Sequence, residues 1–333
     1  MKALRFHEFG DPQAVLRLEE LPDPEPGPGQ VLVRLTARSV NPSDLYTVMG
    51  VYGVRPTLPA VPGNEGAGVV ERVGDGVSGF QAGDRVTLLL GAVPPHEGTW
   101  RELAAIDQQW LIKTPPGVSD EQAATAWVNY LTAWILAFEE FDLKPGEQVL
   151  VTAGASHLGR AMLQLAAHKG FKVIATVRRD EQKQELLDLG AAAVIATDSE
   201  DLSQRAKELT GGKGFKYAID AVSGRVGTEV VANLAPRGVC IIYGLLSQEP
   251  IQIDGRIIFT EAVVRGFWLV RWLQHRPAEH VAGVIATLTR LFADGTLVSP
   301  IDSAFDLSDI AGMLERSNAP GRQGKVVITG PAR

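Results

Sequence analysis

The turn that follows the apolar run Val149–Val151 has residue types that can bind a phosphate. It contains Gly154 and Gly159 and precedes a segment at 160–169 with the composition of a helix. Glycine lets the backbone approach a phosphate, and the N-terminus of the next helix presents unpaired N–H groups to its charge. The strict G-x-G-x-x-G spacing is absent, so the turn alone is a weak signal. Together with a second apolar run, Val173–Val177, it predicts the βαβ unit that binds a dinucleotide pyrophosphate.

Two arginines, Arg178 and Arg179, follow that second run. An NAD-specific fold carries an acidic residue about 20 residues after the turn, where it binds the ribose 2′-hydroxyl. A guanidinium pair suits a 2′-phosphate instead, because it can bind the phosphate oxygens in a bidentate way. The pair therefore favours NADPH over NADH, although two solvated surface arginines would look the same. Asp180 is expected to cap the next helix.

Further elements continue the pattern of the dinucleotide unit. Apolar runs alternate with helical segments, which is typical of a doubly wound parallel sheet. The expected strands are 194–195, 217–220 and 239–243, and the expected helices are 181–189, 199–210 and 225–234. After Gly244 the alternation is expected to stop.

The N-terminal part has a different character. A connector rich in proline and glycine at 22–29 precedes the alternating run Val31–Val40, and several short strands follow. Asn41–Asp44 predicts the start of a short helix, and Ser119–Gln122 has the pattern of a capping box. Short strands separated by turns predict a β-rich domain that is a partly closed barrel.

Length and composition limit the classes of protein. A chain of 333 residues suggests two domains, and its net charge of 32 − 39 = −7 disfavours nucleic acid or an anionic membrane as the partner. The chain has one cysteine, Cys240, which lies in an apolar strand. A single cysteine excludes internal disulfides and a multi-cysteine metal lobe. No apolar run approaches the length of a membrane span, and the N-terminus looks like a strand, so we expect a cytoplasmic protein.

The order of these parts resembles the medium-chain dehydrogenase/reductase superfamily, as do the blocks Gly63–Gly66 and Gly83–Val86. The resemblance implies an α/β protein with a GroES-like β-rich catalytic domain and a Rossmann-type doubly wound parallel sheet. The expected boundaries are 1–125 with 266–333 for the first domain and 126–265 for the second. Zinc-dependent members carry cysteine and histidine where this chain has Ser43 and Asn64, so no metal is expected.

Within that superfamily the chain is most similar to the 2-enoyl thioester reductases of the mitochondrial and bacterial type. The Gly50-x-Tyr52 loop and the Phe267–Trp268 pair are the more specific features, whereas the glycine blocks are shared with quinone reductases. The remaining matching segments are Asn41–Asp44, Leu58–Val61, Gly63–Gly66, Gly98–Arg101, Thr132–Ala133 and Arg265–Leu269. The chain departs from the pattern at His157, where relatives carry glycine, and at Tyr130, where they carry proline.

The resemblance implies roles for single residues. Tyr52 is expected to act as the acid or to orient the thioester, since a phenol with a pKa near 10 is protonated at neutral pH. Asn64 and Thr132 are expected near the nicotinamide, and Lys325 at the cofactor phosphate. As isolated residues Tyr52, Asn64 and Thr132 would more often serve packing or loop and helix contacts, and a solvated lysine would explain Lys325 nearly as well. The other expected cofactor-binding residues are Gly154, Ser156, His157, Leu158, Gly159, Arg178, Arg179, Tyr243, Phe267 and Trp268.

The sequence thus predicts an NADPH-dependent reductase of the C=C bond of trans-2-enoyl thioesters of CoA or acyl carrier protein. The alternatives are an NADPH:quinone oxidoreductase and a non-catalytic NADPH-binding protein. By analogy we expect a homodimer, paired through an edge strand at 239–243 or at 267–270; a monomeric mass by light scattering would contradict it.

Overall fold

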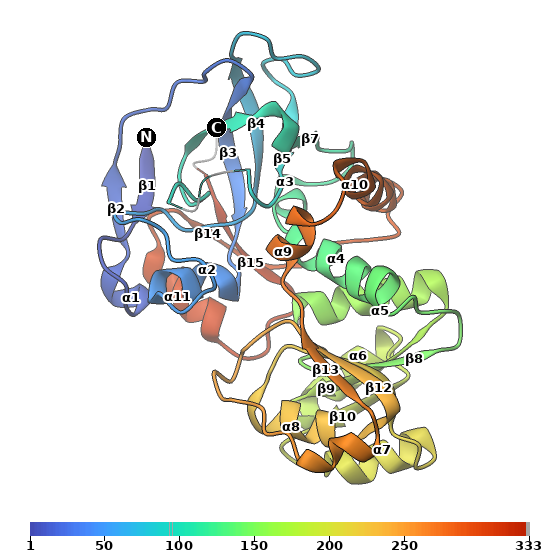
Figure 1. The fold of residues 1–333 in the computed structure, drawn as a ribbon. Helices are drawn as coiled ribbons and strands as arrows, with labels where there is room; N and C mark the ends of the chain where they lie inside the picture. The colour runs from blue at the N-terminus through green and yellow to red at the C-terminus, as the bar shows by residue number, and fades with distance from the viewer. Residues whose placement is uncertain (93, 95, 331–333) are drawn as a thin grey trace. The chain divides into compact units, whose positions relative to one another are not determined.

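The computed structural model describes residues 1–92, 94 and 96–330, and these form two compact units (Figure 1). Unit 1 comprises 1–128 and 289–333, and unit 2 comprises 129–288. The segment 266–288, predicted to return to the first domain, has its contacts within unit 2. Among the described residues, no helix is both long and apolar enough to cross a membrane.

Unit 1 is built on a seven-stranded sheet in the order β14-β15-β3-β4-β5-β7, with β6 also paired to β3. The long strand β3 (Gln30–Ser39) is its centre, because it pairs antiparallel with β4, β6 and β15. Its apolar side chains are buried in a core with those of the neighbouring strands. A separate pair joins β1 (Lys2–Arg5) to β2 (Arg17–Glu20). The remaining strands are β4 (Gly66–Val73), β5 (Arg85–Leu88), β6 (Leu103–Asp107), β7 (Leu111–Lys113), β14 (Ile301–Asp306) and β15 (Lys325–Thr329).

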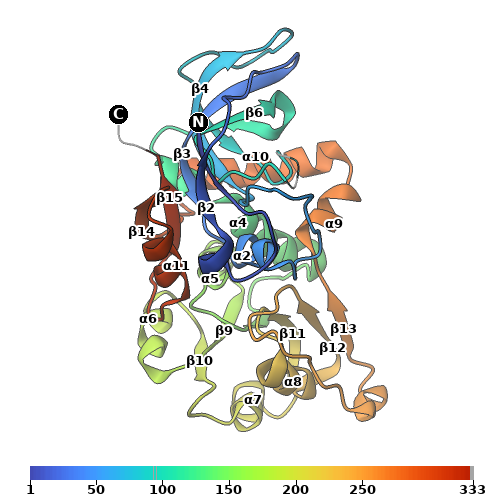
Figure 2. The ribbon, with the colours of Figure 1, turned by 90° about the vertical axis from the view of Figure 1, so that its left-hand side faces the viewer.

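The helices of unit 1 are short, and two of them, α2 (Pro42–Met49) and α3 (Asp120–Ala123), begin where the sequence predicts. Asn41 precedes α2, and Ser119 caps α3 through a capping box. Helix α11 (Ile310–Asn318) lies against β14 and β15 (Figure 2). The others are α1 (Pro12–Val15) and the 3₁₀ turn η1 (Gln108–Trp110).

Unit 2 contains a six-stranded parallel sheet in the order β10-β9-β8-β11-β12-β13. The predicted doubly wound sheet is confirmed. From β8 the chain moves outward through β9 and β10, then returns beside β8 and moves the other way, so the direction switches between β8 and β11. Ligands of such sheets bind at the carboxyl ends of strands at this switch point. The strands are β8 (Gln148–Val151), β9 (Lys172–Val177), β10 (Ala193–Ala196), β11 (Phe215–Asp220), β12 (Leu234–Ile242) and β13 (Val263–Gly266).

Strand β13 corrects two predictions. The alternation does not stop after Gly244, because β13 adds a sixth parallel strand beside β12. The predicted edge at 239–243 is wrong for the same reason, since β12 has a neighbour on each side. The second predicted edge, 267–270, follows β13 and leads into a helix. One edge of the sheet is β13 itself, and the homodimer stays a prediction.

Helices connect the strands of unit 2. Helix α5 (His157–Lys169) begins three residues earlier than the predicted segment, because Ser156 caps it. Helices α7 and α8 lie side by side (Figure 2). The chain enters the unit through α4 (Trp127–Trp134) and the π-helix η2 (Ile135–Glu140). The others are η3 (Asp180–Gln182), α6 (Lys183–Asp188), α7 (Leu202–Thr210), α8 (Gly224–Ala232), η4 (Gly255–Phe259), α9 (Leu269–Gln274) and α10 (Ala278–Ala293).

Candidate active site

The predicted phosphate turn connects β8 to α5 and requires both of its glycines. A Cβ atom on Gly159 would lie 2.2 Å from the carbonyl oxygen of Gly154, and one on Gly154 would lie 2.6 Å from the Cβ of Ala175. Both distances are too short for non-bonded atoms. A larger residue at either position would therefore displace the backbone of Gly154 or the neighbouring strand β9. The Oγ atom of Ser156 accepts a hydrogen bond from the N–H of Gly159 at 3.2 Å, which fixes the start of the helix. The turn thus brings backbone and helix N-terminus together as a dinucleotide site requires.

A buried carboxylate, Asp220, accepts a hydrogen bond from Thr152, the first residue of this turn. The sequence analysis did not identify Asp220 as a functional residue. It lies at the carboxyl end of β11, and its Oδ1 accepts a hydrogen bond from the Thr152 hydroxyl at 2.7 Å. Both of its oxygens also accept backbone N–H groups, from Val222 at 3.0 Å and Ser223 at 2.9 Å. The ends of β8 and β11 are therefore joined at the switch point. An acidic residue directly after a buried apolar run was the available signal.

The two residues at which the chain departs from the family pattern contact each other. The rings of His157 and Tyr130 pack edge to face with centroids 5.5 Å apart and an interplanar angle of 80°. Both side chains are buried. The Tyr130 hydroxyl accepts a hydrogen bond from Gln164 Nε2 at 3.2 Å, and burial raises the pKa of this phenol above its ordinary value. His157 therefore packs against helix α4 from the first turn of α5.

Other predicted cofactor residues of unit 2 lie at strand ends. Arg178 is exposed after β9, and Arg179 Nε lies 3.8 Å from the Glu181 carboxylate. Tyr243 follows β12, and burial of its hydroxyl, with the nearby negative charge of Asp220, raises its pKa. The remaining predicted residues are Leu158, buried in α5; Thr132, buried in α4; and Phe267 and Trp268, both half-buried after β13.

In unit 1, Tyr52 lies in a loop fixed by the end of α2. Gly50 ends that helix with a φ of 73°, and the N–H groups of Val51 and Tyr52 donate to the carbonyl of Tyr46 at 3.0 and 3.2 Å. Arg55 Nε donates to the Gly50 carbonyl at 2.8 Å, which ties the far side of the loop to the same point. The backbone at Tyr52 is thus held by the helix, although its ring is half-buried.

Asn64 belongs to a buried polar cluster at the start of α2. Its Nδ2 atom donates to Asp44 Oδ1, and more weakly to the Ser43 hydroxyl at 3.4 Å. Asp44 Oδ2 accepts the backbone N–H of Asn41 at 2.7 Å. Burial raises the pKa of Asp44 to about 7, and the nearby Glu65 carboxylate adds to the shift while hydrogen bonds and Lys325 oppose it.

Lys325 lies in the same cluster. Its Nζ atom donates to Asn41 Oδ1, and the side chain is buried. Burial lowers the pKa of this ammonium to about 8, although the carboxylates of Glu65 and Asp44 favour its charged form. Within unit 1 the Lys325 ammonium therefore lies near the carboxylates of Glu65 and Asp44 and bonds to Asn41. This geometry gives no support to the predicted contact with a cofactor phosphate.

Zinc does not fit the residues at the predicted positions. Ser43 and Asn64 offer a hydroxyl and an amide, and the amide nitrogen already donates to Asp44. Zinc prefers thiolate, imidazole and carboxylate ligands. Over residues 1–92, 94 and 96–330, no group of three or more His, Cys, Asp or Glu side chains could hold a metal ion.

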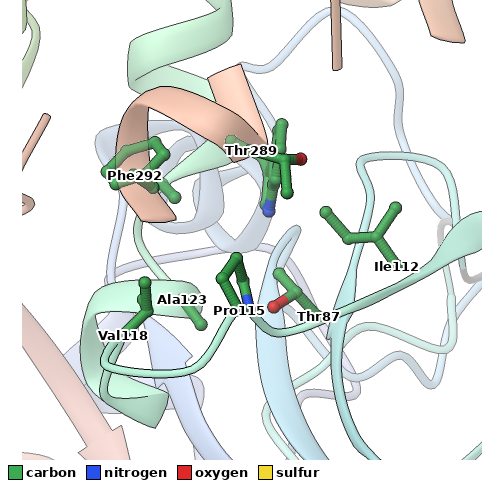
Figure 3. A pocket seen from close by; sticks show the side chains of 9 residues that line it. Thr87, Ile112, Pro115, Val118, Ala123, Thr289 and Phe292 are labelled. Carbon is green, nitrogen blue, oxygen red and sulfur yellow. The ribbon is translucent and has the colours of Figure 1, made fainter. Parts of the chain in front are cut away.

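A small cavity of unit 1 is lined mostly by apolar side chains (Figure 3). Its volume is about 10 Å³, which leaves room for one water molecule at most. None of the side chains that line it titrates, so it is a packing defect without chemistry. They are Thr87, Ile112, Pro115, Val118, Ala123, Ala126, Trp127, Thr289 and Phe292.

Comparison with known proteins agrees with this architecture. The model of the alcohol dehydrogenase GroES-like domain matches residues 27–116, and that of the zinc-binding dehydrogenases matches residues 158–287. The mitochondrial enoyl-[acyl-carrier-protein] reductase of Bos taurus is 33% identical over 334 residues, covering 99% of this chain and 88% of the bovine protein.

Solved structures of two bacterial proteins are also similar to this chain. A quinone oxidoreductase of Pseudomonas syringae pv. Tomato DC3000 superposes with a TM-score of 0.88 and 31% identity, covering 98% of this chain and 99% of the other. The Escherichia coli quinone oxidoreductase complexed with NADPH gives a TM-score of 0.87 and 28% identity, covering 99% and 100%.

Proposed function

Since the chain belongs to the medium-chain dehydrogenase/reductase family and is an oxidoreductase, we propose that it reduces the C=C bond of trans-2-enoyl thioesters with NADPH. The observation that carries the proposal is the similarity to an enoyl-[acyl-carrier-protein] reductase along almost the whole chain. The thioester would be carried by CoA or by acyl carrier protein.

The residues of unit 2 fit the proposed cofactor. Gly154 and Gly159 leave the space that a pyrophosphate needs, and the start of α5 offers N–H groups to it. Arg178 and Arg179 would bind a 2′-phosphate, which would distinguish NADPH from NADH. When bound, NADPH would supply a hydride to the β-carbon of the thioester.

Residues of the chain must then stabilise the negative charge of the reaction intermediate and supply a proton. Addition of hydride to the β-carbon moves an electron pair to the thioester oxygen as an enolate, and the α-carbon next takes up a proton. We propose that the Tyr52 hydroxyl donates to that oxygen or delivers that proton, and that Asn64 and Thr132 orient the reactants. A neutral phenol needs no tuning for either role. The products are the saturated thioester and NADP⁺.

Quinone reduction is the second candidate, because solved quinone oxidoreductases are similar along the whole chain. It uses the same hydride donor but no dedicated proton donor. The third alternative, a non-catalytic NADPH-binding protein, is set aside because the chain is an oxidoreductase.

The test is the initial rate of NADPH oxidation with crotonyl-CoA, run beside NADH and beside a simple quinone. We expect the thioester to be reduced with a preference for NADPH. Tyr52→Phe should lower this rate by about a hundredfold, the usual loss of a proton donor. Tyr217→Phe is the matched control, because that ring packs on Phe141 with centroids 4.9 Å apart in unit 2.

Two outcomes would contradict the proposal. Turnover of the quinone alone, unchanged in Tyr52→Phe, would assign the chain to quinone reduction and leave Tyr52 a packing role. Tight binding of NADPH with no reduction of the thioester would likewise contradict it.

A further inference from the structure

The buried carboxylate of Glu65 has no role in the reaction proposed above, yet it accepts four hydrogen bonds within unit 1. Its side chain is fully buried. Oε1 accepts hydrogen bonds from the Ser39 hydroxyl at 3.0 Å and from Asn41 Nδ2 at 2.9 Å. Oε2 accepts the backbone N–H groups of Trp127 at 3.1 Å and Val128 at 2.7 Å. Both oxygens are thus engaged twice, and each with a different part of the chain.

The two backbone donors are the first N–H groups of helix α4. A helix leaves these groups without partners, and a side chain just before the helix usually accepts them. Here the preceding residue is Ala126, which has no acceptor. A carboxylate that lies 62 residues earlier in sequence takes its place. The negative charge also favours the positive end of the helix dipole.

The other oxygen reaches the start of helix α2. Asn41 precedes that helix, and its backbone N–H is held by Asp44 Oδ2. Lys325 joins the same residue through Asn41 Oδ1. At its other end α2 holds the Tyr52 loop through the Tyr46 carbonyl. The carboxylate therefore ties together the N-termini of two helices, one that ends at the Tyr52 loop and one that carries Thr132.

We propose that Glu65 is a positioning residue of the reductase, which holds the N-termini of α2 and α4 within unit 1. Helix α2 ends at the Tyr52 loop, and α4 is the helix that carries Thr132. The inference rests on the function proposed above. An amide cannot replace the carboxylate in full, because it has only one acceptor oxygen for two pairs of donors. If that oxygen faces Asn41 Nδ2 and Ser39, the two N–H groups of α4 lose their acceptor, and if it faces α4, the amide nitrogen meets Asn41 Nδ2 as donor against donor. Two buried donors without a partner would let the first turn of the helix open.

The test is Glu65→Gln, measured in two independent ways. Backbone amide exchange of a peptide covering Trp127 and Val128 should become about tenfold faster, while a peptide from β3 stays unchanged. The kcat with crotonyl-CoA should fall by about tenfold to a hundredfold, with the KM for NADPH unchanged, because the phosphate turn is intact. Glu71→Gln, which removes an acid of β4 that pairs with Arg34, is the control and should alter neither.

A second variant separates the helix contact from simple charge balance. If Glu65 only compensates the buried Lys325, then Glu65→Gln combined with Lys325→Met should recover kcat. If it holds α4, the combined variant should keep both the fast amide exchange and the low kcat. If Glu65→Gln alone fails to fold, the same measurements are made on the combined variant. That variant removes the charges of both Glu65 and Lys325, so neither is left buried without the other.

Each result decides the inference. Unchanged exchange at Trp127 and Val128 would overturn it, as would fast exchange with an unaltered kcat, or recovery of kcat in the combined variant. Failure of the function proposed above looks different, since the wild-type chain would then not reduce crotonyl-CoA. In that case kcat is measured with a quinone in place of crotonyl-CoA. The amide exchange at Trp127 and Val128 reports the contact between Glu65 and α4 independently of turnover.

Discussion

The glycine turn between β8 and α5 in unit 2 and the buried polar cluster of unit 1 place their residues by opposite means. The turn consists of consecutive residues and has no charged side chain between Thr152 and Gly159 apart from His157, when that residue is protonated. Its shape depends on the space that two glycines leave. The cluster joins Asn41, Asp44, Glu65 and Lys325 through hydrogen bonds and buried charges.

This difference has consequences for what each region can tolerate. A turn whose shape depends on close packing around glycine is disrupted when one carbon atom is added. Its shape does not depend on pH. An electrostatic cluster tolerates the addition of an atom better, but its stability depends on which groups carry a proton. Substitutions in the two regions should therefore be distinguishable by what is measured, as well as by how large the effect is.

The largest effect is expected in the turn. Gly159→Ala places a Cβ atom 2.2 Å from the Gly154 carbonyl oxygen and 2.7 Å from the Gly154 Cα. The backbone must open, so the groups that would bind the pyrophosphate separate. We expect the Kd for NADPH, measured by fluorescence titration, to rise by at least about a hundredfold, which corresponds to roughly 2.7 kcal/mol.

The matched control is Gly283→Ala in α10. A Cβ atom there meets nothing within 4 Å, and the residue is in a helix where alanine is favoured. It should leave the affinity for NADPH unchanged and raise stability slightly. If Gly159→Ala bound NADPH as the control does, the cofactor would not be held by this turn.

The turn was predictable because its rules are local. Apolar runs, glycine positions and a helix start within 30 or so residues determine a βαβ unit. The turn between β8 and α5 was predicted for that reason, and so was the start of α2 at Asn41–Pro42; the cofactor contacts of Gly154, Ser156 and Gly159 stay a prediction. Strand β13 was missed because it is short, half exposed and preceded by a long irregular stretch.

The cluster was not predictable, because its partners are distant in the sequence. Glu65 was visible within a glycine block, but its contacts to Trp127 and Val128 depend on the packing of a helix that begins 62 residues later. Lys325 was assigned to a phosphate by analogy, and only the pairing of β15 with β3 shows that it lies beside Asn41. Long-range pairing of buried charges leaves no periodic signal in the sequence.

A second, intermediate effect is expected in the cluster and depends on pH. The folded protein keeps a proton on Asp44 up to a pKa of about 7, whereas the unfolded chain loses it near 3.8. Between these values unfolding releases a proton, so the free energy of unfolding should fall as the pH rises. Urea unfolding of the wild type and Asp44→Asn should show a difference that changes by about 1.4 kcal/mol per pH unit between these values.

Asp84→Asn provides the control for that slope. Hydrogen bonds from Lys113 and the Gln81 backbone lower the pKa of Asp84, so its contribution to stability is lost only as the pH falls below its ordinary range. Asp84→Asn should therefore leave the slope between pH 4 and 7 as in the wild type. A wild-type slope that survives Asp44→Asn would show that other groups titrate and that the cluster is not the pH-sensitive region.

The smallest effect tests the contact between His157 and Tyr130, where the local turn meets a distant helix. Edge-to-face aromatic pairs contribute about 0.5–1.5 kcal/mol beyond the area they bury. We therefore expect a double-mutant cycle of His157→Ala and Tyr130→Leu to give a coupling energy of about 1 kcal/mol in the free energy of unfolding. The pair Phe138 and Phe171, with centroids 6.0 Å apart at 78°, is the control for an aromatic contact outside the turn.

The same variants show whether that contact belongs to the turn or only to the core. If His157 shapes the turn, His157→Ala should raise the Kd for NADPH about threefold, and Tyr130→Leu should produce most of the same change by releasing the ring. The Phe138 and Phe171 variants should lose stability without any change in Kd. Equal loss of affinity in both pairs would mean that general softening of unit 2 weakens cofactor binding. The steric turn would then depend on distant packing almost as much as the charged cluster does.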